Sequence, residues 1–459
     1  MSSRISLLPL LALAASVAPA RAQQPDTGPL LRAVGSPEGL RLSGSLRARY
    51  EALSGQFRPG FDADDDLFSL RTIVTAEYAA GAVRIGAELY DSRAYGGMVG
   101  SAVSANDVNA LELVQAYIAA DFEDPLGAGS RASVQAGRFT LNLGSRRLVA
   151  GDEYRNTTNG FTGLRADLRL RGGTSATLIY VLPQLRLPDD LPSVLDNEVG
   201  FDRESFDLRL WGGLIARNRA IGSAAVEATY LRLEERDASD RPTRDRRLHN
   251  FGVRLIREPA AGSLDYEAEV ILQRGGISAS LAPAAPRLDV SAYFLHLELG
   301  YSFPGPWRPH LSFEYDLASG DGPGPKYGRF DTLFGMRRGD LAPAGIYAAL
   351  GRTNISTPGV RLEVAPSQRL DAFLAYRLLW AEAAQDAFST TNVRDASGAS
   401  GRFAGHQIEG RLRWWIVPRL LRWEANGAWL IKRGILRHAP NAPTTGDSVY
   451  VSVATTILF

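Results

Sequence analysis

The sequence of 459 residues has no cysteine, which excludes a disulfide scaffold, a zinc–thiolate site and a thiol nucleophile. Lysine is also nearly missing: Lys326 and Lys432 are the only two, so almost all positive charge is arginine. The 51 basic and 50 acidic side chains leave no basic excess, which argues against a nucleic-acid partner. Beyond the N-terminal segment there is no run of about 18 uncharged apolar residues, so no transmembrane helix is expected.

The N-terminal segment has the pattern of a secretory signal peptide. Arg4 supplies a positive start, residues 7–17 are an apolar stretch too short to span a bilayer, and an Ala-Arg-Ala motif ends at Ala22. We therefore expect cleavage near Ala22. The expected divisions are a signal peptide, a loose Pro- and Gly-rich leader and a single barrel domain, over residues 1–22, 23–39 and 40–459.

From Leu40 onward the dominant period is two. In the first segment Leu42, Leu46 and Tyr50 fall on one face, whereas Arg47 and Arg49 fall on the other. Side chains of a strand point alternately to opposite faces, so this pattern predicts one apolar wall and one charged wall.

The pattern recurs often enough to predict eighteen strands, most of them ten residues or longer. Transmembrane strands need about 9–11 residues, and bacterial barrels have even strand numbers. The expected strands span residues 40–53, 68–78, 83–92, 110–122, 131–140, 161–171, 175–182, 205–214, 224–234, 249–257, 264–274, 290–303, 309–318, 353–364, 368–382, 406–416, 420–433 and 448–459.

The connections between these strands run alternately long and short, which is typical of an outer-membrane protein. Since an open sheet edge would leave backbone groups unpaired in lipid, the sheet must close. The sequence therefore predicts an all-β fold: a closed antiparallel transmembrane β-barrel of about 18 strands with short periplasmic turns and long extracellular loops. Its expected location is the bacterial outer membrane, among lipid and lipopolysaccharide.

The last segment alternates up to a terminal aromatic residue. Val449, Val451, Val453, Ile457 and Phe459 share one face. This resembles the C-terminal strand that outer-membrane proteins present to their assembly machinery, which would then be a partner.

The charged face of the strands is expected to line the lumen. Arginine dominates the first, sixth, fifteenth and sixteenth strands, whereas acids dominate the eleventh to thirteenth, roughly across the barrel. Two interpretations stay open: an internal salt-bridge network that braces the wall, or a charged constriction in which arginine forks bind carboxylates. The candidate pathway residues are Arg47, Arg49, Arg71, Arg138, Arg165, Arg169, Arg209, Arg411, Arg413, Asp265, Glu267 and Glu269.

No cofactor and no firm metal site are expected. The five histidines are scattered without metal-ligand spacing, and no local signature of a hydrolase occurs, so an enzyme is not predicted. An acidic stretch in the first outer loop is most simply a solvated loop; the alternative is a site for calcium or a cation bridging lipopolysaccharide. Its carboxylates are Asp62, Asp64, Asp65 and Asp66.

Two blocks of the chain resemble the alginate export family of outer-membrane barrels. The first, over residues 115–122 and 135–170, contains Gly137-Arg138, Arg147-Leu148, Tyr154-Arg155-Asn156 and Phe161; the second is ASGD at 318–321 followed by GRFDTLFG at 328–335. The resemblance implies an eighteen-stranded barrel that passes an anionic polysaccharide or a small acidic solute.

The function expected first is therefore an outer-membrane channel for anionic solutes, similar to polysaccharide export porins. The alternatives are a general or substrate-specific uptake porin and a structural or adhesive barrel without transport. An export channel should have a continuous wide pore, an uptake porin should have loops folded into the lumen, and an adhesin should have a plugged lumen.

Overall fold

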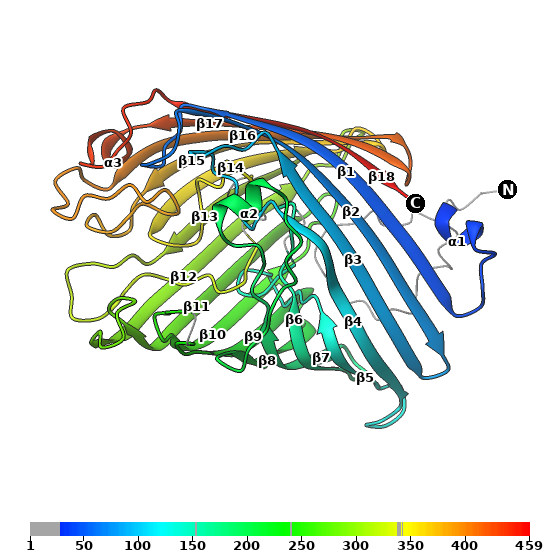
Figure 1. The fold of residues 1–459 in the computed structure, drawn as a ribbon. Helices are drawn as coiled ribbons and strands as arrows, with labels where there is room; N and C mark the ends of the chain where they lie inside the picture. The colour runs from blue at the N-terminus through cyan, green and yellow to red at the C-terminus, as the bar shows by residue number, and fades with distance from the viewer. Residues whose placement is uncertain (1–27, 152–153, 239–240, 337–340, 342) are drawn as a thin grey trace.

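The computed structural model describes residues 28–151, 154–238, 241–336, 341 and 343–459. The expected signal peptide and its cleavage site lie outside the described residues. The described residues form one antiparallel sheet of eighteen strands, in which each strand pairs with its neighbours in sequence and β1 also pairs with β18. The barrel is therefore closed, as the sequence predicted (Figure 1).

The strands are bounded as follows: β1 (Leu40–Ser54), β2 (Asp64–Ala80), β3 (Val83–Tyr95), β4 (Asn109–Glu123), β5 (Arg131–Phe139), β6 (Phe161–Arg169), β7 (Thr174–Pro183), β8 (Leu208–Ile221), β9 (Ala224–Glu235), β10 (Arg247–Arg257), β11 (Leu264–Ser278), β12 (Arg287–Ser302), β13 (His310–Ala318), β14 (Ile355–Val364), β15 (Leu370–Trp380), β16 (Phe403–Val417), β17 (Leu421–Lys432) and β18 (Ser448–Leu458).

Three short helices lie outside the sheet: α1 (Pro29–Ala33), α2 (Leu191–Leu195) and α3 (Gly434–His438). The first lies in the leader that was expected to be loose, so that expectation is wrong for this turn of helix. Within the described ranges, no helix is long and apolar enough to cross a membrane. The C-terminus and α1 lie at the end of the barrel that carries the short turns (Figure 1), which we take as periplasmic.

The predicted strands match the observed ones in number and order, and the ends differ. β2 begins at Asp64 rather than at residue 68, because the acidic residues pair in register with Ala52 to Ser54 of β1. The eighth strand extends to Ile221 instead of ending at 214. Residues 217–219 (Arg-Asn-Arg) in this extension are polar and exposed, a composition that in sequence is typical of a turn.

The outward face of the barrel is apolar, with exposed side chains such as Leu164, Leu178 and Phe313. The inward face differs between its two ends. Toward the periplasm it carries charged side chains. Toward the long loops it is apolar and buried, and it packs on residues of the loops. Inward residues of this apolar core include Leu53, Leu67, Leu210, Leu233, Phe294 and Leu430.

Candidate functional site

Loop 140–160, between β5 and β6, reaches the inner face of β11. The Arg147 guanidinium binds Glu269 at 2.6 Å and also binds Glu267. Ser145 Oγ donates a hydrogen bond to the same Glu269 carboxylate at 2.9 Å. Arg147 and Glu269 are both buried, so this ion pair is held away from water. The acids predicted to line the pathway are thus occupied by a loop arginine.

The same loop is held on the other side of the barrel by main-chain contacts. Arg47 on β1 and Arg71 on β2 both donate to the carbonyl oxygen of Arg155, at 2.8 and 3.0 Å. Arg49 donates to the carbonyl of Tyr154 and pairs with Glu51 at 2.9 Å. β1 and β11 lie on opposite sides of the ring, because β2–β10 separate them one way and β12–β18 the other. Loop 140–160 therefore crosses the lumen.

Side-chain hydrogen bonds strengthen this second attachment. The Tyr154 hydroxyl lies 2.7 Å from that of Tyr450 on β18, which in turn donates to Glu51 at 2.6 Å. The Asn156 amide donates to three main-chain carbonyls, those of Leu70, Arg93 and Asp107, at 2.8–3.1 Å. Each of these groups is a buried polar group that needs a partner, so the loop is fixed in one position.

Loop 319–354, between β13 and β14, packs against loop 140–160 inside the barrel. Ala150 N donates to Phe334 O at 3.0 Å, and Phe334 N donates to Leu148 O at 2.9 Å. The rings of Phe161 and Phe334 meet edge to face with centroids 5.6 Å apart. Further along the loop, Tyr347 is fully buried. The two blocks of the family resemblance thus meet in space as the two loops that narrow the lumen.

Two carboxyl groups in the loops have strongly perturbed pKa values. Burial raises the pKa of Asp107 to about 7, and the nearby Glu51 carboxylate raises it further. Burial and the Glu112 carboxylate likewise raise the pKa of Asp202 to about 7. Asp202 accepts a hydrogen bond from the Asn109 amide at 2.8 Å, which ties loop 184–207 to the start of β4. Docking of these loops should therefore respond to pH.

Four of the predicted arginines face the lumen away from the loops, toward the periplasm. Arg165 pairs with Asp167 at 2.7 Å along β6, and Arg169 follows it on the same inward face. Their positions lie among inward residues that are partly exposed. On β16, two arginines share the Asp371 carboxylate, each at 2.8 Å; they are Arg411 and Arg413. The side chains of Arg165, Arg411 and Arg413 keep 18–22% of their surface exposed.

Two predicted pathway arginines lie on the other face of the sheet. By the alternation of β5, Arg138 shares the outward side with the exposed Val134, and it pairs with Glu112 and Glu204. Arg209 shares the outward side of β8 with the exposed Ile215. Leu210, which the alternation assigned to lipid, is instead buried on the inner side under the loops. The assignment of Arg209 to the lumen is therefore wrong, because this end of the barrel is apolar inside.

The remaining predicted acids lie where they were expected or serve the loops. Asp265 faces the lumen at the periplasmic end of β11 and binds His310. The acidic stretch braces loops: Asp64 accepts from Ser54 Oγ at 2.6 Å, and Asp65 accepts from Ser101 Oγ at 2.8 Å. In the described part of the chain, the acids of residues 62–66 form no metal-binding group.

The acids of β11 were predictable from the alternating pattern, whereas the loop arginine that binds them was not. Arg147 stood in the motif of the family resemblance without being assigned to the site, and Tyr347 was not singled out. The two motif blocks of the family resemblance lie in two long loops. A long loop that carries such a motif is more often a functional loop with a defined position than a disordered one, and this could have indicated that the loops dock inside the barrel.

The family model for alginate export matches residues 39–429, which is most of the chain. The chain belongs to the alginate export family. The family and the barrel together identify an outer-membrane channel. No curated protein matches the sequence.

Solved structures that resemble the chain are porins with low sequence identity. A BenF-like porin from Pseudomonas fluorescens Pf-5 is 12% identical, with 92% of this chain and 99% of that chain covered and a TM-score of 0.59. OpdK from Pseudomonas aeruginosa with vanillate is 11% identical, with coverages of 91% and 98% and a TM-score of 0.58. OccK2 (OpdF) from Pseudomonas aeruginosa in complex with glucuronate is 13% identical, with coverages of 92% and 99% and a TM-score of 0.55. At these identities the likeness establishes the fold.

Proposed function

We propose that this member of the alginate export family is a passive, substrate-selective channel for small acidic solutes, of which acidic sugars are the favoured class. The carboxylate of the solute is drawn along the arginines that face the lumen toward the periplasm. Arg411 and Arg413 form one group on β16, and Arg165 and Arg169 form another on β6. A guanidinium fork binds a carboxylate with two parallel hydrogen bonds and keeps its charge at any physiological pH.

One observation carries this proposal: loop 140–160 crosses the lumen and is anchored on both walls. Its attachments at Arg147 on one side and Tyr154 on the other are buried, and loop 319–354 packs against it. A lumen narrowed in this way favours single small solutes, which is the property expected of a substrate-specific uptake porin. Two of the structurally similar porins were solved with small carboxylates, vanillate and glucuronate.

The test is a swelling assay with proteoliposomes that contain the purified barrel. Glucuronate should enter faster than glucose, which has nearly the same size and no charge. The double variant Arg411→Gln/Arg413→Gln should lose most of that preference, whereas glucose entry should stay unchanged. Equal rates for the two sugars in the parent protein would contradict selection by charge.

The same vesicles distinguish the alternative of polymer export. Preloaded oligouronates should be retained if the loops admit only small solutes. Release of oligomers at a rate comparable to that of glucuronate would favour a polysaccharide channel and would contradict the present proposal. Full closure to both sugars would favour an adhesive or structural barrel.

We further propose that the signal peptide is cleaved near Ala22 and that the outer-membrane assembly machinery then binds β18. Phe459 pairs with Gly44 of β1 through both main-chain groups, at 2.6 and 2.9 Å, and a side chain at Gly44 would overlap the Phe459 ring. Deletion of Phe459 should lower the amount of protein in the outer membrane. Phe459→Tyr is the control, and insertion of the deleted chain at the parent level would contradict the assignment.

A further inference from the structure

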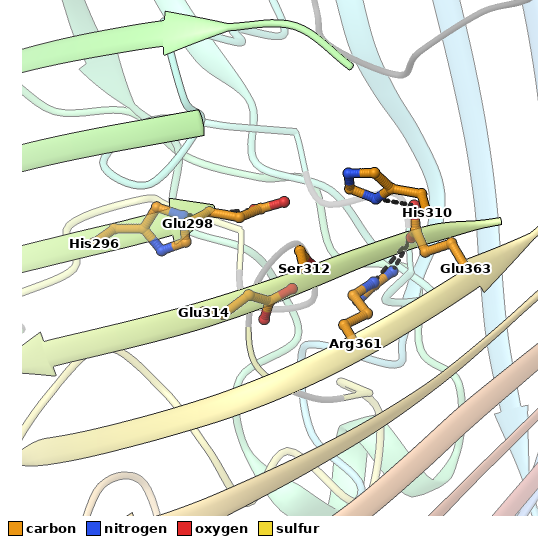
Figure 2. Close-up of a pocket in the computed structure, with 7 residues that line it drawn as sticks. All are labelled: His296, Glu298, His310, Ser312, Glu314, Arg361 and Glu363. Carbon is orange, nitrogen blue, oxygen red and sulfur yellow. Dashed lines mark hydrogen bonds and ion pairs between the residues drawn. The ribbon is translucent and has the colours of Figure 1, made fainter. Parts of the chain in front are cut away.

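A pocket of about 150 Å³ lies on the inner wall near the periplasmic ends of β12, β13 and β14. All of its lining side chains are polar or charged, and they project from β12, β13 and β14 (Figure 2). Its lining residues are His296, Glu298, His310, Ser312, Glu314, Arg361 and Glu363. Neither the family nor the selectivity argument accounts for two imidazoles in this position.

The ligand atoms of three residues at this pocket converge. One oxygen each of Asp265 and Glu298 and one nitrogen of His310 lie within 4.8 Å of one another. His310 Nε2 is 3.0 Å from the Asp265 carboxylate. The Asp265 side chain is buried, and that of His310 is 12% exposed. The Glu298 side chain is 27% exposed. A cation could therefore reach the group from the lumen.

The second ring nitrogen of His310 faces a carboxylate, as in many metal sites. His310 Nδ1 lies 3.8 Å from Glu363, and Arg361 holds Glu363 in place at 2.7 Å. At this distance the Glu363 carboxylate acts on the imidazole as a nearby negative charge rather than as a hydrogen-bond acceptor. Nε2, which faces Asp265, is then the ligand nitrogen.

Two further side chains of the pocket each have one buried polar atom without a hydrogen-bond partner. His296 is 1% exposed; its Nδ1 lies 2.8 Å from Asp316, while its Nε2 makes no hydrogen bond and faces Glu298 at 3.8 Å. Ser312 Oγ is also buried and has no partner. Buried polar atoms are rarely left unsatisfied in native proteins. Orphaned atoms around one pocket therefore point to a ligand in it.

Gly300 makes room for the convergence of the three ligands. It lies on β12 opposite both Asp265 and Ser312 in the strand registers. A methyl group at this position would overlap Asp265 Oδ1 and His310 Nε2. An alanine is otherwise acceptable in an extended strand, so Gly300→Ala is a specific way to block the site from the backbone.

The geometry points to a divalent metal site formed by Asp265, Glu298 and His310 at the periplasmic mouth of the lumen. One imidazole and two carboxylates suit a first-row metal such as Zn²⁺, whereas Mg²⁺ prefers oxygen ligands and keeps its waters. Three protein ligands leave a coordination position open. Sequence spacing could not reveal the site, because its ligands come from three different strands.

The test uses the full-length barrel, refolded in detergent and checked by its heat-modifiable migration, with Zn²⁺ and Mg²⁺ as probes. Equilibrium dialysis with elemental analysis should find one Zn²⁺ per chain. Since loss of even an outer-shell partner lowers metal affinity by about 10- to 100-fold, Glu298→Gln and Gly300→Ala should each weaken binding at least about tenfold. His406→Gln, which removes an imidazole bound to Tyr376 on another strand pair, is the matched control and should bind as the parent does.

Two outcomes would overturn the site in favour of a diffuse acidic surface. One is Zn²⁺ binding that is weakened equally in the His406→Gln control, and the other is Mg²⁺ binding as tight as that of Zn²⁺. The absence of stoichiometric Zn²⁺ from the parent protein would overturn it outright. If a variant does not refold, anomalous diffraction from zinc-soaked crystals of the parent protein decides the question, since the peak must lie between Asp265, Glu298 and His310. None of these outcomes depends on which solute the channel passes.

Discussion

The two ends of the lumen follow opposite rules. Toward the outside, inward residues such as Leu210 and Phe294 are apolar and fully buried beneath the loops, and polar groups there bind loop backbone. Toward the periplasm, inward residues such as Arg165 and Arg413 are charged, and their side chains keep about a fifth of their surface exposed. The same alternating pattern therefore places apolar side chains inside the barrel at the extracellular end and charged side chains inside it at the periplasmic end. The reason is that docked loops fill the extracellular half of the barrel, whereas the periplasmic half is open to water.

This contrast separates the two interpretations of the lumen charges. Arg47, Arg49, Glu267 and Glu269 hold loop 140–160, so they brace the constriction. On β6 and β16, Arg165, Arg411 and Arg413 instead pair with the neighbouring wall acids Asp167 and Asp371. We therefore propose that bracing and selecting occupy different depths of the barrel.

The largest effect is expected when loop 140–160 is released from the barrel wall, because the two ends of the lumen would then no longer differ. Arg147→Gln would remove the arginine bound to Glu269 and leave Glu267 with the wall residue Arg254. Breaking a buried ion pair from one side costs about 3–5 kcal/mol. We expect the loop to leave the lumen, which single-channel recordings should detect as a higher conductance. The protein should still insert, because Arg147 lies outside the strands.

Arg254→Gln is the matched control for this variant. Arg254 binds the same Glu267 carboxylate at 2.9 Å, but from the barrel wall. Its loss should leave the loop in place and the conductance close to that of the parent. An equal rise in conductance for both variants would mean that wall charges, rather than the loop, set the width of the channel.

A second prediction compares the two faces of one strand. Leu164 is 55% exposed on the outward face of β6, and Arg165 is its neighbour on the inward face. Leu164→Arg should cost about 2–4 kcal/mol if the residue lies near the middle of the bilayer, and it should lower the folded fraction in lipid vesicles. Arg165→Gln should fold like the parent. Equal folding of the two variants would show that the inside and outside assignments are reversed here.

How much of this arrangement the sequence could give depends on the depth in the barrel. Period two, the strand count and the loop lengths predicted the closed barrel, because they reflect the local geometry of each strand. The same period placed Arg209 in the lumen, since alternation states only that two faces differ. Which face is inside at the outer end depends on loops 140–160 and 319–354, and their docking is set by contacts between residues far apart in sequence, such as Arg147 with Glu267.

A third prediction concerns pH and is confined to the outer half. The pKa of Asp202 is raised from 3.8 to about 7, so the docked loop binds more protons than the free loop between those values. Docking of loop 184–207 should therefore be strongest near pH 4 and weaken as the pH rises to about 7. Protection of this loop from hydrogen exchange, taken relative to the intrinsic exchange rate at each pH, should be higher at pH 5 than at pH 8. Asp202→Asn, which keeps an acceptor for the Asn109 amide, should show equal protection at both pH values. Protection that still falls with pH in this variant would assign the effect to another group.

The smallest expected effect is on ion preference. It tests directly whether the β16 arginines select ions while the β1 arginines hold the loop. Neutralising Arg411 and Arg413 together should shift the reversal potential in a salt gradient toward less anion preference, because a few charges in a narrow pore bias which ion enters. The shift should shrink at high salt, since the Debye length falls from about 10 Å at 0.1 M to about 3 Å at 1 M. Neutralising Arg47 and Arg49 should instead change mainly the conductance, because these side chains act through the loop that they hold. If the β1 pair moved the reversal potential more than the β16 pair at unchanged conductance, selection would lie at the loop constriction, and the division between an outer bracing half and an inner selecting half would be wrong.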